Sequence, residues 1–197
     1  PLTMNATDSR HRPSLFRLLP RLACQDRSPR AAQVTFALAI GCVVFSSIWL
    51  GLGASRLWDR DEPRNARCTM EMLQRGDWIV PMFNDQLRTH KPILLYWCQM
   101  GSFAILGTND FAARFSGATA ASFAVLATAW LGYRLGNRSI AFWSAAALAT
   151  SMMFVVAARA ATPDPLLIGT GTVGVACLIS GWLSQTASGS WKLDAAG

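Results

Sequence analysis

The stretch "VTFALAIGCVVFSSIWLGLGA", residues 34–54, holds 21 amino acids and no charged side chain. About 20 apolar residues in a helix are enough to cross the hydrocarbon core of a bilayer. A chain in lipid has to satisfy its own backbone hydrogen bonds, which a helix does along its length. A signal peptide is a poor interpretation, because the apolar stretch is too long and 33 residues precede it. The stretch therefore predicts a transmembrane helix.

Three further windows have the same character, at residues 115–133, 139–158 and 165–183. Ala, Gly, Ser and Thr recur in the first two of these windows, and such small residues let membrane helices approach closely. The chain of 197 residues is 52% hydrophobic and only 15% charged, against roughly 25% charged residues in soluble domains. We therefore predict an all-α fold: a polytopic integral membrane protein with about four transmembrane helices.

The loop between the first two windows predicts two juxtamembrane amphipathic helices. Residues 63–76 begin with a proline and end with a glycine, a pattern typical of helix boundaries, and Glu62 is a possible N-cap. This helix is too short to span and suits the membrane interface. Residues 92–107 are uncharged but also short for a span, so we expect a second surface helix with Tyr96 and Trp97 at the interface.

Arginine placement predicts the orientation in the membrane. The first 33 residues hold six arginines, and the link between the second and third windows holds Arg134 and Arg138. Cytoplasmic loops carry an excess of Lys and Arg, so we expect the N-terminus and this link to be cytoplasmic. The first loop also holds many arginines, together with seven acidic residues.

Four crossings would place the loop after the first span and the turn after the third span on the same outer face. The loop holds Asp61 and Glu62, and the turn holds Arg159 and Asp164. Two acidic clusters about a hundred residues apart in sequence would then meet at the membrane surface. This convergence favours a functional site over a set of unrelated loop charges.

Each of these residues also has a structural interpretation. Glu62 before a proline and Asp164 before a proline both fit helix N-caps. Asp61 could pair with a neighbouring arginine, and His90 could be an ordinary solvated loop residue.

The long loop carries an ordered set of short motifs that resembles one enzyme family. The motifs are "DE" at 61–62, "EML" at 71–73, "GDWIVP" at 76–81, "KP" at 91–92, "YW" at 96–97, then Gly107, Asn109, Phe111 and Arg114, and finally "AARAATPDPLL" at 157–167. They resemble the polyprenyl-phosphate-dependent glycosyltransferases of the GT-C fold. Bacterial aminoarabinose transferases acting on lipid A are the nearer branch, and protein O-mannosyltransferases are more distant. The resemblance covers about residues 45–185.

The resemblance implies a sugar donor on a polyprenyl phosphate and a lipid, glycan or protein acceptor at the periplasmic face of a bacterial inner membrane. It implies that Asp61 is catalytic, by deprotonating or orienting the acceptor, and that Asp164 is a second acidic catalytic position. Glu62 is implied in acceptor binding or site organisation, and Lys91 faces the donor phosphate. Arg159 has no firm counterpart in the family, and we expect it to bind substrate.

The chemistry of such a transfer agrees with these roles. The leaving group is already a phosphate, so it needs a cation such as Lys91 rather than a proton. The attacking hydroxyl benefits from a carboxylate base, typically by 10²–10⁴-fold, and one in-line carboxylate predicts inversion at the anomeric carbon. No organic cofactor is implied. A divalent metal ion could assist, with His90 as a candidate ligand where the aminoarabinose branch carries a glutamate.

The expected organisation has three parts. Residues 1–33 form a basic cytoplasmic segment, residues 34–185 form the N-terminal transmembrane part of a GT-C domain with its outer loop at 55–114, and residues 186–197 form a tail. Because family members continue for hundreds of residues, we expect this chain to be an N-terminal fragment.

Other functions fit the sequence less well. A transporter or channel subunit would carry ionisable residues inside its spans, and these spans have almost none; a non-catalytic membrane scaffold is the other alternative. The net charge of +7 comes from arginines between apolar runs and forms no single basic face, which favours lipid headgroups over nucleic acid. The five cysteines lack metal-ligand spacing, although Cys68 and Cys98 could pair.

Overall fold

The computed structural model of the chain describes residues 30–57, 60–84 and 86–187. The predicted N-terminal segment and C-terminal tail therefore lie largely outside the described residues. The described elements, in chain order, are α2 (Arg30–Val44), the π-helix η1 (Phe45–Trp49), α3 (Asp61–Arg75), β1 (Met82–Phe83), β2 (Gln86–Leu87), α4 (Ile93–Leu106), α5 (Asp110–Leu135), α6 (Arg138–Thr150), α7 (Met152–Ala158) and α8 (Asp164–Ala187).

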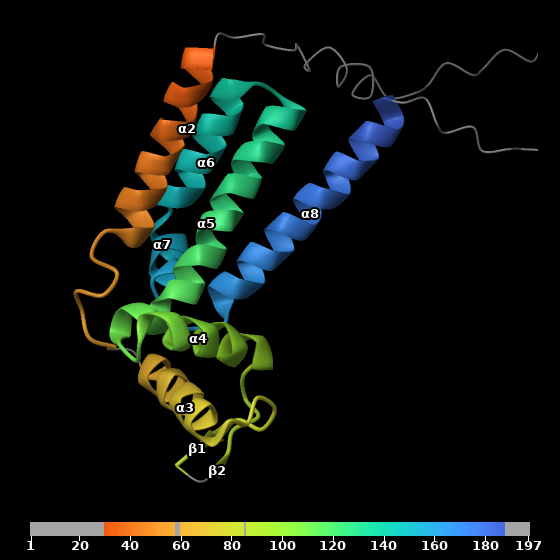
Figure 1. Cartoon of the computed structure of the whole chain (residues 1–197). Helices are drawn as coiled ribbons and strands as arrows, with labels where there is room; N and C mark the ends of the chain where they lie inside the picture. Colours follow the sequence, from red (N-terminus) through yellow and green to blue (C-terminus); the bar gives the residue numbers. More distant parts are fainter. Residues whose placement is uncertain (1–29, 58–59, 85, 188–197) are drawn as a thin grey trace, which may run out of the picture.

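Three described helical segments are long and apolar enough to cross a membrane: Ala31–Trp49, Asp110–Leu135 and Asp164–Gln185. The pair α6 and α7 passes the same test together but is bent by 68°. The described part of the chain is thus almost wholly helical, with four apolar segments in a bundle (Figure 1). This confirms the predicted all-α membrane fold.

The predicted first span was too long at its C-terminal end. The helix ends at Trp49, and residues 50–54 form turns instead. Gly51 has a positive φ of 71°, a conformation that suits glycine and ends the helix. Arg159 donates a hydrogen bond of 2.9 Å to the carbonyl oxygen of Leu50, which satisfies one of the free carbonyl groups at this helix end.

The predicted third span is broken rather than continuous. Ser151 adopts an extended backbone (φ −62°, ψ 120°) between α6 and α7. Because this residue leaves the helical region, the hydrogen-bond ladder is interrupted and the two segments change direction there. Hydropathy alone reports an apolar run and gives no sign of this bend.

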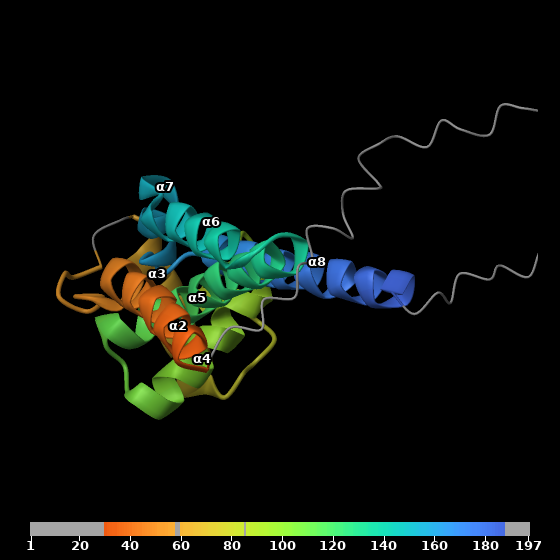
Figure 2. The ribbon, with the colours of Figure 1, turned by 90° about the horizontal axis from the view of Figure 1, so that it is seen from above.

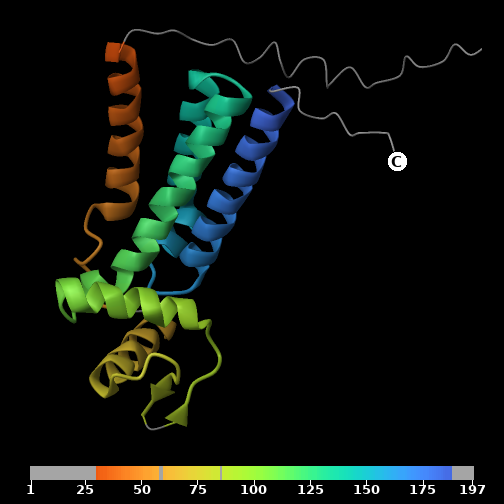
Figure 3. The same ribbon diagram turned by 45° about the vertical axis from the view of Figure 1, so that its right-hand side comes forward.

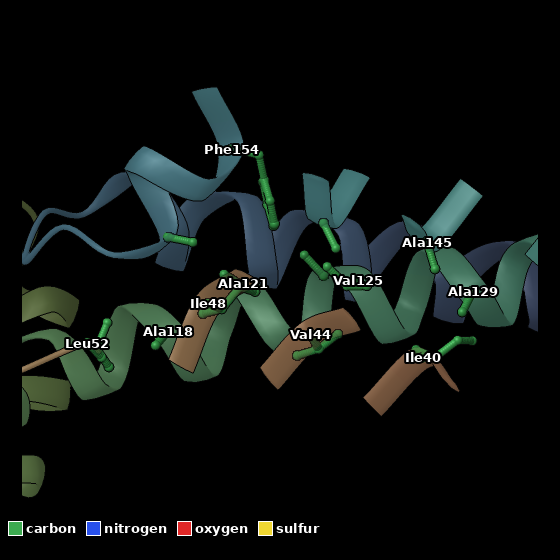
Figure 4. Packing of buried hydrophobic residues seen from close by; sticks show 13 residues of the cluster. Ile40, Val44, Ile48, Leu52, Ala118, Ala121, Val125, Ala129, Ala145 and Phe154 are labelled. Atoms are coloured by element: carbon green, nitrogen blue, oxygen red, sulfur yellow. The ribbon is translucent and has the colours of Figure 1, made fainter. Parts of the chain in front are cut away.

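Helix α5 is the centre of the bundle and starts five residues earlier than the predicted span. The side chain of Asn109 caps it by accepting a hydrogen bond of 2.8 Å from the amide of Ala112. The core around α5 is rich in alanine, as the prediction of close packing by small residues requires. Figure 4 shows Ile40, Val44 and Ile48 of the first span lying along α5.

Helix α8 packs beside α5 and tilts away from α2 and α6 (Figures 1 and 2). A Cβ atom at Gly169 would lie only 2.5 Å from the carbonyl oxygen of Ala120. At that point the backbones of α8 and α5 are in contact, which only a glycine allows. Farther along, the Trp130 indole donates a hydrogen bond of 3.0 Å to the Ser180 hydroxyl.

Helices α3 and α4 lie beyond one end of the bundle, with α4 across that end and α3 next to it (Figures 1 and 3). Segment 92–107 therefore does not span, as predicted. A short hairpin of β1 and β2 joins α3 to α4, with Phe83 paired to Gln86. The predicted apolar face of α3 is confirmed, because Ala66, Met70 and Leu73 pack against α4 and the start of α5.

Three details of this region differ from the predictions. Helix α3 begins at Asp61, so Glu62 lies in its first turn and is not the N-cap. Tyr96 is buried beside Cys68 rather than exposed at the interface, while Trp97 is 45% exposed. Cys68 and Cys98 are both free and form no disulfide.

Candidate functional site

Asp61, at the start of α3, and Lys91, just before α4, form an ion pair. Lys91 Nζ lies 2.8 Å from Asp61 Oδ2, and both side chains are partly exposed. The hydrogen bond from Lys91 lowers the pKa of the Asp61 carboxyl below its ordinary value, and the charges of Arg88 and Arg64 lower it further. The carboxylate therefore stays ionised and accessible at neutral pH.

Glu62, the next residue, has the opposite environment. Its side chain is 1% exposed and makes two hydrogen bonds with Arg114 of α5, at 3.0 Å from Nε and 2.9 Å from Nη2. Arg114 also donates to the backbone carbonyls of Leu52, Ser55 and Arg56. A buried charge is stable only when it is paired and hydrogen-bonded, and this pair ties α3, α5 and the end of the first span together.

The turn between α7 and α8 is joined directly to α3. Oε1 of Glu62 accepts a hydrogen bond of 2.8 Å from the amide of Ala161, and the side-chain amide of Asn65 donates one of 3.0 Å to the carbonyl of the same residue. These contacts link positions almost a hundred residues apart in sequence. The predicted meeting of the first loop and this turn at one end of the bundle is therefore confirmed.

Arg159 and Asp164 flank that turn. Arg159 ends α7 and is bonded to the end of the first span, as described above. Asp164 starts α8 and is exposed. Its carboxylate makes no hydrogen bond or ion pair with any described residue. Asp164 therefore does not cap α8 with its side chain, contrary to the structural interpretation. Their roles in substrate binding and catalysis stay predictions.

The described part of the chain holds no set of side chains that could bind the predicted metal ion. His90 is exposed, and no three His, Cys, Asp or Glu side chains among the described residues are grouped so as to hold a metal ion. The described residues at this end therefore do not form a metal centre by themselves, and we assign no step of the reaction to a metal.

A buried polar network beside the ion pair was missed by the sequence analysis. Thr69 donates a hydrogen bond of 2.7 Å to Gln99, which donates one of 3.1 Å to the carbonyl of Ala113. Asn65 accepts one of 3.0 Å from Arg88. The signal that could have revealed the network is the spacing of Glu62, Asn65 and Thr69, which places three polar side chains on one face of α3.

A groove of about 420 Å³ lies between α4, α5 and α8. Its lining is nearly all apolar and includes Ile105, Phe115 and Phe123. The hydroxyl of Ser116 also lines it and is buried without a hydrogen-bond partner among the described residues. The groove is thus an apolar recess flanked by a surface helix and two membrane helices.

Comparisons with known proteins agree on one family. Residues 42–196 match the sequence profile described as dolichyl-phosphate-mannose-protein mannosyltransferase. An undecaprenyl phosphate-alpha-4-amino-4-deoxy-L-arabinose arabinosyl transferase from Enterobacter sp. (strain 638) is 32% identical over 160 residues, covering 80% of this chain and 28% of that protein. The protein of the same name from Photorhabdus laumondii is 39% identical over 132 residues, covering 64% of this chain and 22% of that protein.

A solved structure shares the fold. The crystal structure of ArnT from Cupriavidus metallidurans bound to undecaprenyl phosphate matches with a TM-score of 0.63 and 27% sequence identity, over 76% of this chain and 27% of that chain. The chain therefore spans about a quarter of the length of these similar proteins. Together the similarities confirm the resemblance seen in the loop motifs.

Proposed function

Because the chain belongs to the family of dolichyl-phosphate-mannose-protein mannosyltransferases, we propose that it forms the N-terminal membrane part of a glycosyltransferase. The donor is a sugar linked to a polyprenyl phosphate. Similar proteins are named for an undecaprenyl phosphate aminoarabinose donor, so we place the donor of this chain among undecaprenyl phosphate sugars. The acceptor is a lipid, glycan or protein, with a membrane lipid favoured by the same similarity.

The active end is the one formed by α3, α4 and the turn before α8. We place it at the periplasmic face of a bacterial inner membrane, with the N-terminus in the cytoplasm. Arg134 and Arg138 lie at the opposite end of the bundle, in and beside the link between α5 and α6, and the positive-inside rule assigns that end to the cytoplasm.

Lys91 and Asp61 divide the chemistry. The ammonium group of Lys91 binds the donor phosphate and stabilises the negative charge that grows on it as the sugar leaves. The carboxylate of Asp61 accepts the proton of the attacking acceptor hydroxyl. The sugar passes to the acceptor with inversion, and the polyprenyl phosphate keeps the bonding electrons of the broken sugar–oxygen bond.

The resting ion pair gives this division a physical basis. In the free protein Lys91 bonds to Asp61 at 2.8 Å. A donor phosphate competes for the same ammonium group, and Asp61 then loses the main contact that lowers its pKa. The carboxylate becomes a stronger base when the donor is in place.

Glu62 and Arg114 act as positioning residues in this proposal. Their buried pair holds the first turn of α3, and therefore Asp61, at a set distance from α5 and the turn before α8. Asp164 and Arg159 border the acceptor side, where the exposed carboxylate of Asp164 is available to orient an acceptor.

The observation that carries the proposal is the ion pair between Lys91 and Asp61, because Asp61 lies on α3, the helix that is joined to the turn before α8. The test compares Asp61→Asn with Asp77→Asn in the purified protein. Asp77 lies in the same loop and only accepts hydrogen bonds from the amides of Ile79 and Val80, which asparagine can also do. Transfer of labelled sugar from an undecaprenyl phosphate donor should fall by about 10²-fold or more in Asp61→Asn.

The Asp77→Asn variant should keep its transfer rate within about twofold of the original. Membrane insertion of both variants is checked by extraction and size-exclusion profile. Undiminished transfer by an inserted Asp61→Asn protein would remove Asp61 as the base.

A further inference from the structure

Arg88 is a half-buried cation that has no acidic partner among the described residues. Its Nη2 donates a hydrogen bond of 3.0 Å to Asn65 Oδ1, and its Nε is buried with no hydrogen-bond partner among the described residues. It forms no salt bridge with any described acid. Burying a charge without a partner is costly, so this side chain is arranged for an anion that comes from elsewhere.

The guanidinium group of Arg88 is held in place from several sides. This group lies over the ring of Phe83, 5.6 Å from the ring centroid. The backbone amide of Arg88 donates a hydrogen bond of 2.9 Å to the carbonyl of Pro81. Asn65, which receives its hydrogen bond, is itself fixed to the carbonyl of Ala161. Such anchoring reduces the entropy lost when the group binds a ligand.

The groups around Arg88 do not neutralise it. Burial raises the pKa of the Tyr96 phenol to about 12 and also raises that of the Cys68 thiol, so both stay uncharged at neutral pH. The charge of Arg88 helps to lower the pKa of the Asp61 carboxyl, and Asp61 is already bonded to Lys91. Three cations, Arg64, Arg88 and Lys91, thus act on the carboxylate of Asp61.

We propose that Arg88 is a second phosphate-binding residue, which grips the phosphate of the lipid donor together with Lys91. This inference rests on the proposed function and adds a residue to it. An arginine has five N–H donors in a planar fork, and Asn65 uses only one of those on Arg88. The remaining donors can bind two phosphate oxygens, while Lys91 supplies a single point charge.

The link through Asn65 gives the contact a second consequence. Arg88, Asn65 and the carbonyl of Ala161 form a continuous chain of hydrogen bonds from the loop before α4 to the turn before α8. A phosphate bound by Arg88 is therefore positioned relative to the two elements that carry Asp61 and Asp164.

The test measures lipid binding rather than turnover. The protein in lipid nanodiscs is titrated with undecaprenyl phosphate and, separately, with undecaprenol, which has the same chain and no phosphate. Arg88→Gln should weaken binding of undecaprenyl phosphate roughly tenfold, as expected for losing one charged hydrogen-bonded contact. Arg88→Lys, which keeps the charge and loses the fork, should fall between the original protein and Arg88→Gln.

Two comparisons separate binding from folding. Arg67→Gln removes a charge from the exposed face of α3, where Glu71 is the partner of Arg67 among the described residues, and should leave the affinity unchanged. Binding of undecaprenol should be the same in all variants. A loss of affinity for both lipids in Arg88→Gln would mean that Arg88 only supports the fold, and would overturn the inference.

The remaining outcomes distinguish the inference from the proposed function. If Lys91→Gln loses affinity for undecaprenyl phosphate and Arg88→Gln does not, the inference is wrong and the proposed function stands. If the original protein binds undecaprenyl phosphate no better than undecaprenol, the proposed donor is wrong and the inference falls with it. If Arg88→Gln instead loses affinity only for a phosphorylated acceptor lipid such as lipid A, the assignment to the donor is overturned.

Discussion

At the scale of single residues, two adjacent carboxylates have different roles because their surroundings differ. Asp61 faces solvent and meets a partly exposed lysine, whereas Glu62 is enclosed and shares its charge with Arg114. An exposed pair is worth little to stability. A buried pair is costly to break, because the remaining partner is left as an uncompensated charge.

The buried pair leads to a stability prediction. Arg114→Met should lower the free energy of unfolding by about 3–5 kcal/mol, because the buried carboxylate of Glu62 loses its guanidinium partner. Arg67→Met, which removes the i,i+4 pair between a largely exposed arginine and Glu71, should change the free energy of unfolding by about 0.5 kcal/mol or less. Unfolding in detergent, followed by far-UV circular dichroism, measures both, and equal effects would contradict a structural role for the buried pair.

The lowered pKa of Asp61 leads to a pH prediction. A carboxyl whose pKa is lower in the folded than in the unfolded protein stabilises the fold above its unfolded value, 3.8 here. That contribution disappears as the pH falls through the folded pKa. Lys91→Met should therefore destabilise the protein at pH 6 and have little effect at the lowest pH at which the protein is still folded.

The same substitution in an Asp61→Asn background is the control for that experiment. Without the carboxylate, Lys91→Met should have an effect that does not change between the two pH values. Thermal unfolding in detergent at each pH gives the four stabilities of the cycle. A pH-dependent effect that persists without Asp61 would assign the titration to another group.

At the scale of elements, the bundle depends on how closely α5 and α8 approach each other. A Cβ atom added at Gly169 would lie 2.5 Å from the carbonyl oxygen of Ala120, so there is no room for a methyl group. Close packing by small residues was predicted for the second and third spans, and the sequence does not say which glycine of α8 lies at a contact with α5. That depends on how each helix is rotated about its axis, which packing decides.

Two glycines of α8 make a matched pair for testing this contact. Gly169→Ala should destabilise the protein by about 1–3 kcal/mol, because the helices must move apart. Gly174→Ala, whose added Cβ would meet nothing within 4 Å, should be neutral or stabilising, because alanine favours helix by about 0.5–1 kcal/mol. The midpoints of thermal unfolding in detergent test the difference, and similar midpoints would refute the close contact.

At the scale of the whole molecule, the helix bundle brings two segments that are distant in sequence to the same end. Helices α2, α5, the α6–α7 pair and α8 alternate in direction (Figure 1), so the segment after the first helix and the turn before the last lie together. The GT-C type of fold shared with ArnT places α3 and α4 over that end.

This arrangement predicts a labelling pattern in membranes. In a protein whose native cysteines are replaced by alanine, Asn84→Cys and Asp164→Cys should react with an impermeant maleimide added outside the inner membrane. Ser139→Cys, at the other end of the bundle, should react only after the membrane is opened. If positions 84 and 164 reacted from opposite sides, the proposed site could not form; if all three patterns were reversed, only the orientation would be wrong.

The sequence by itself determined what depends on local composition and order. Long uncharged segments predict helices in a membrane, alternating crossings predict that Asp61 and Asp164 share a face, and loop motifs predict the family and the importance of Lys91. These features are predictable because a bilayer permits few backbone structures and each crossing reverses the side. Glycine and proline mark helix ends because they act on the backbone directly, as Gly76 does at the end of α3.

Only the tertiary structure decided which partners these residues have. Glu62 was expected to cap a helix and instead lies buried against Arg114, 52 positions away. The position of Arg88 beside Asn65 gave no signal in the sequence, and the 68° bend at Ser151 was hidden in an apolar run. Such features depend on the rotation and tilt of packed helices, which arise from contacts between distant segments and leave no periodic pattern in the chain.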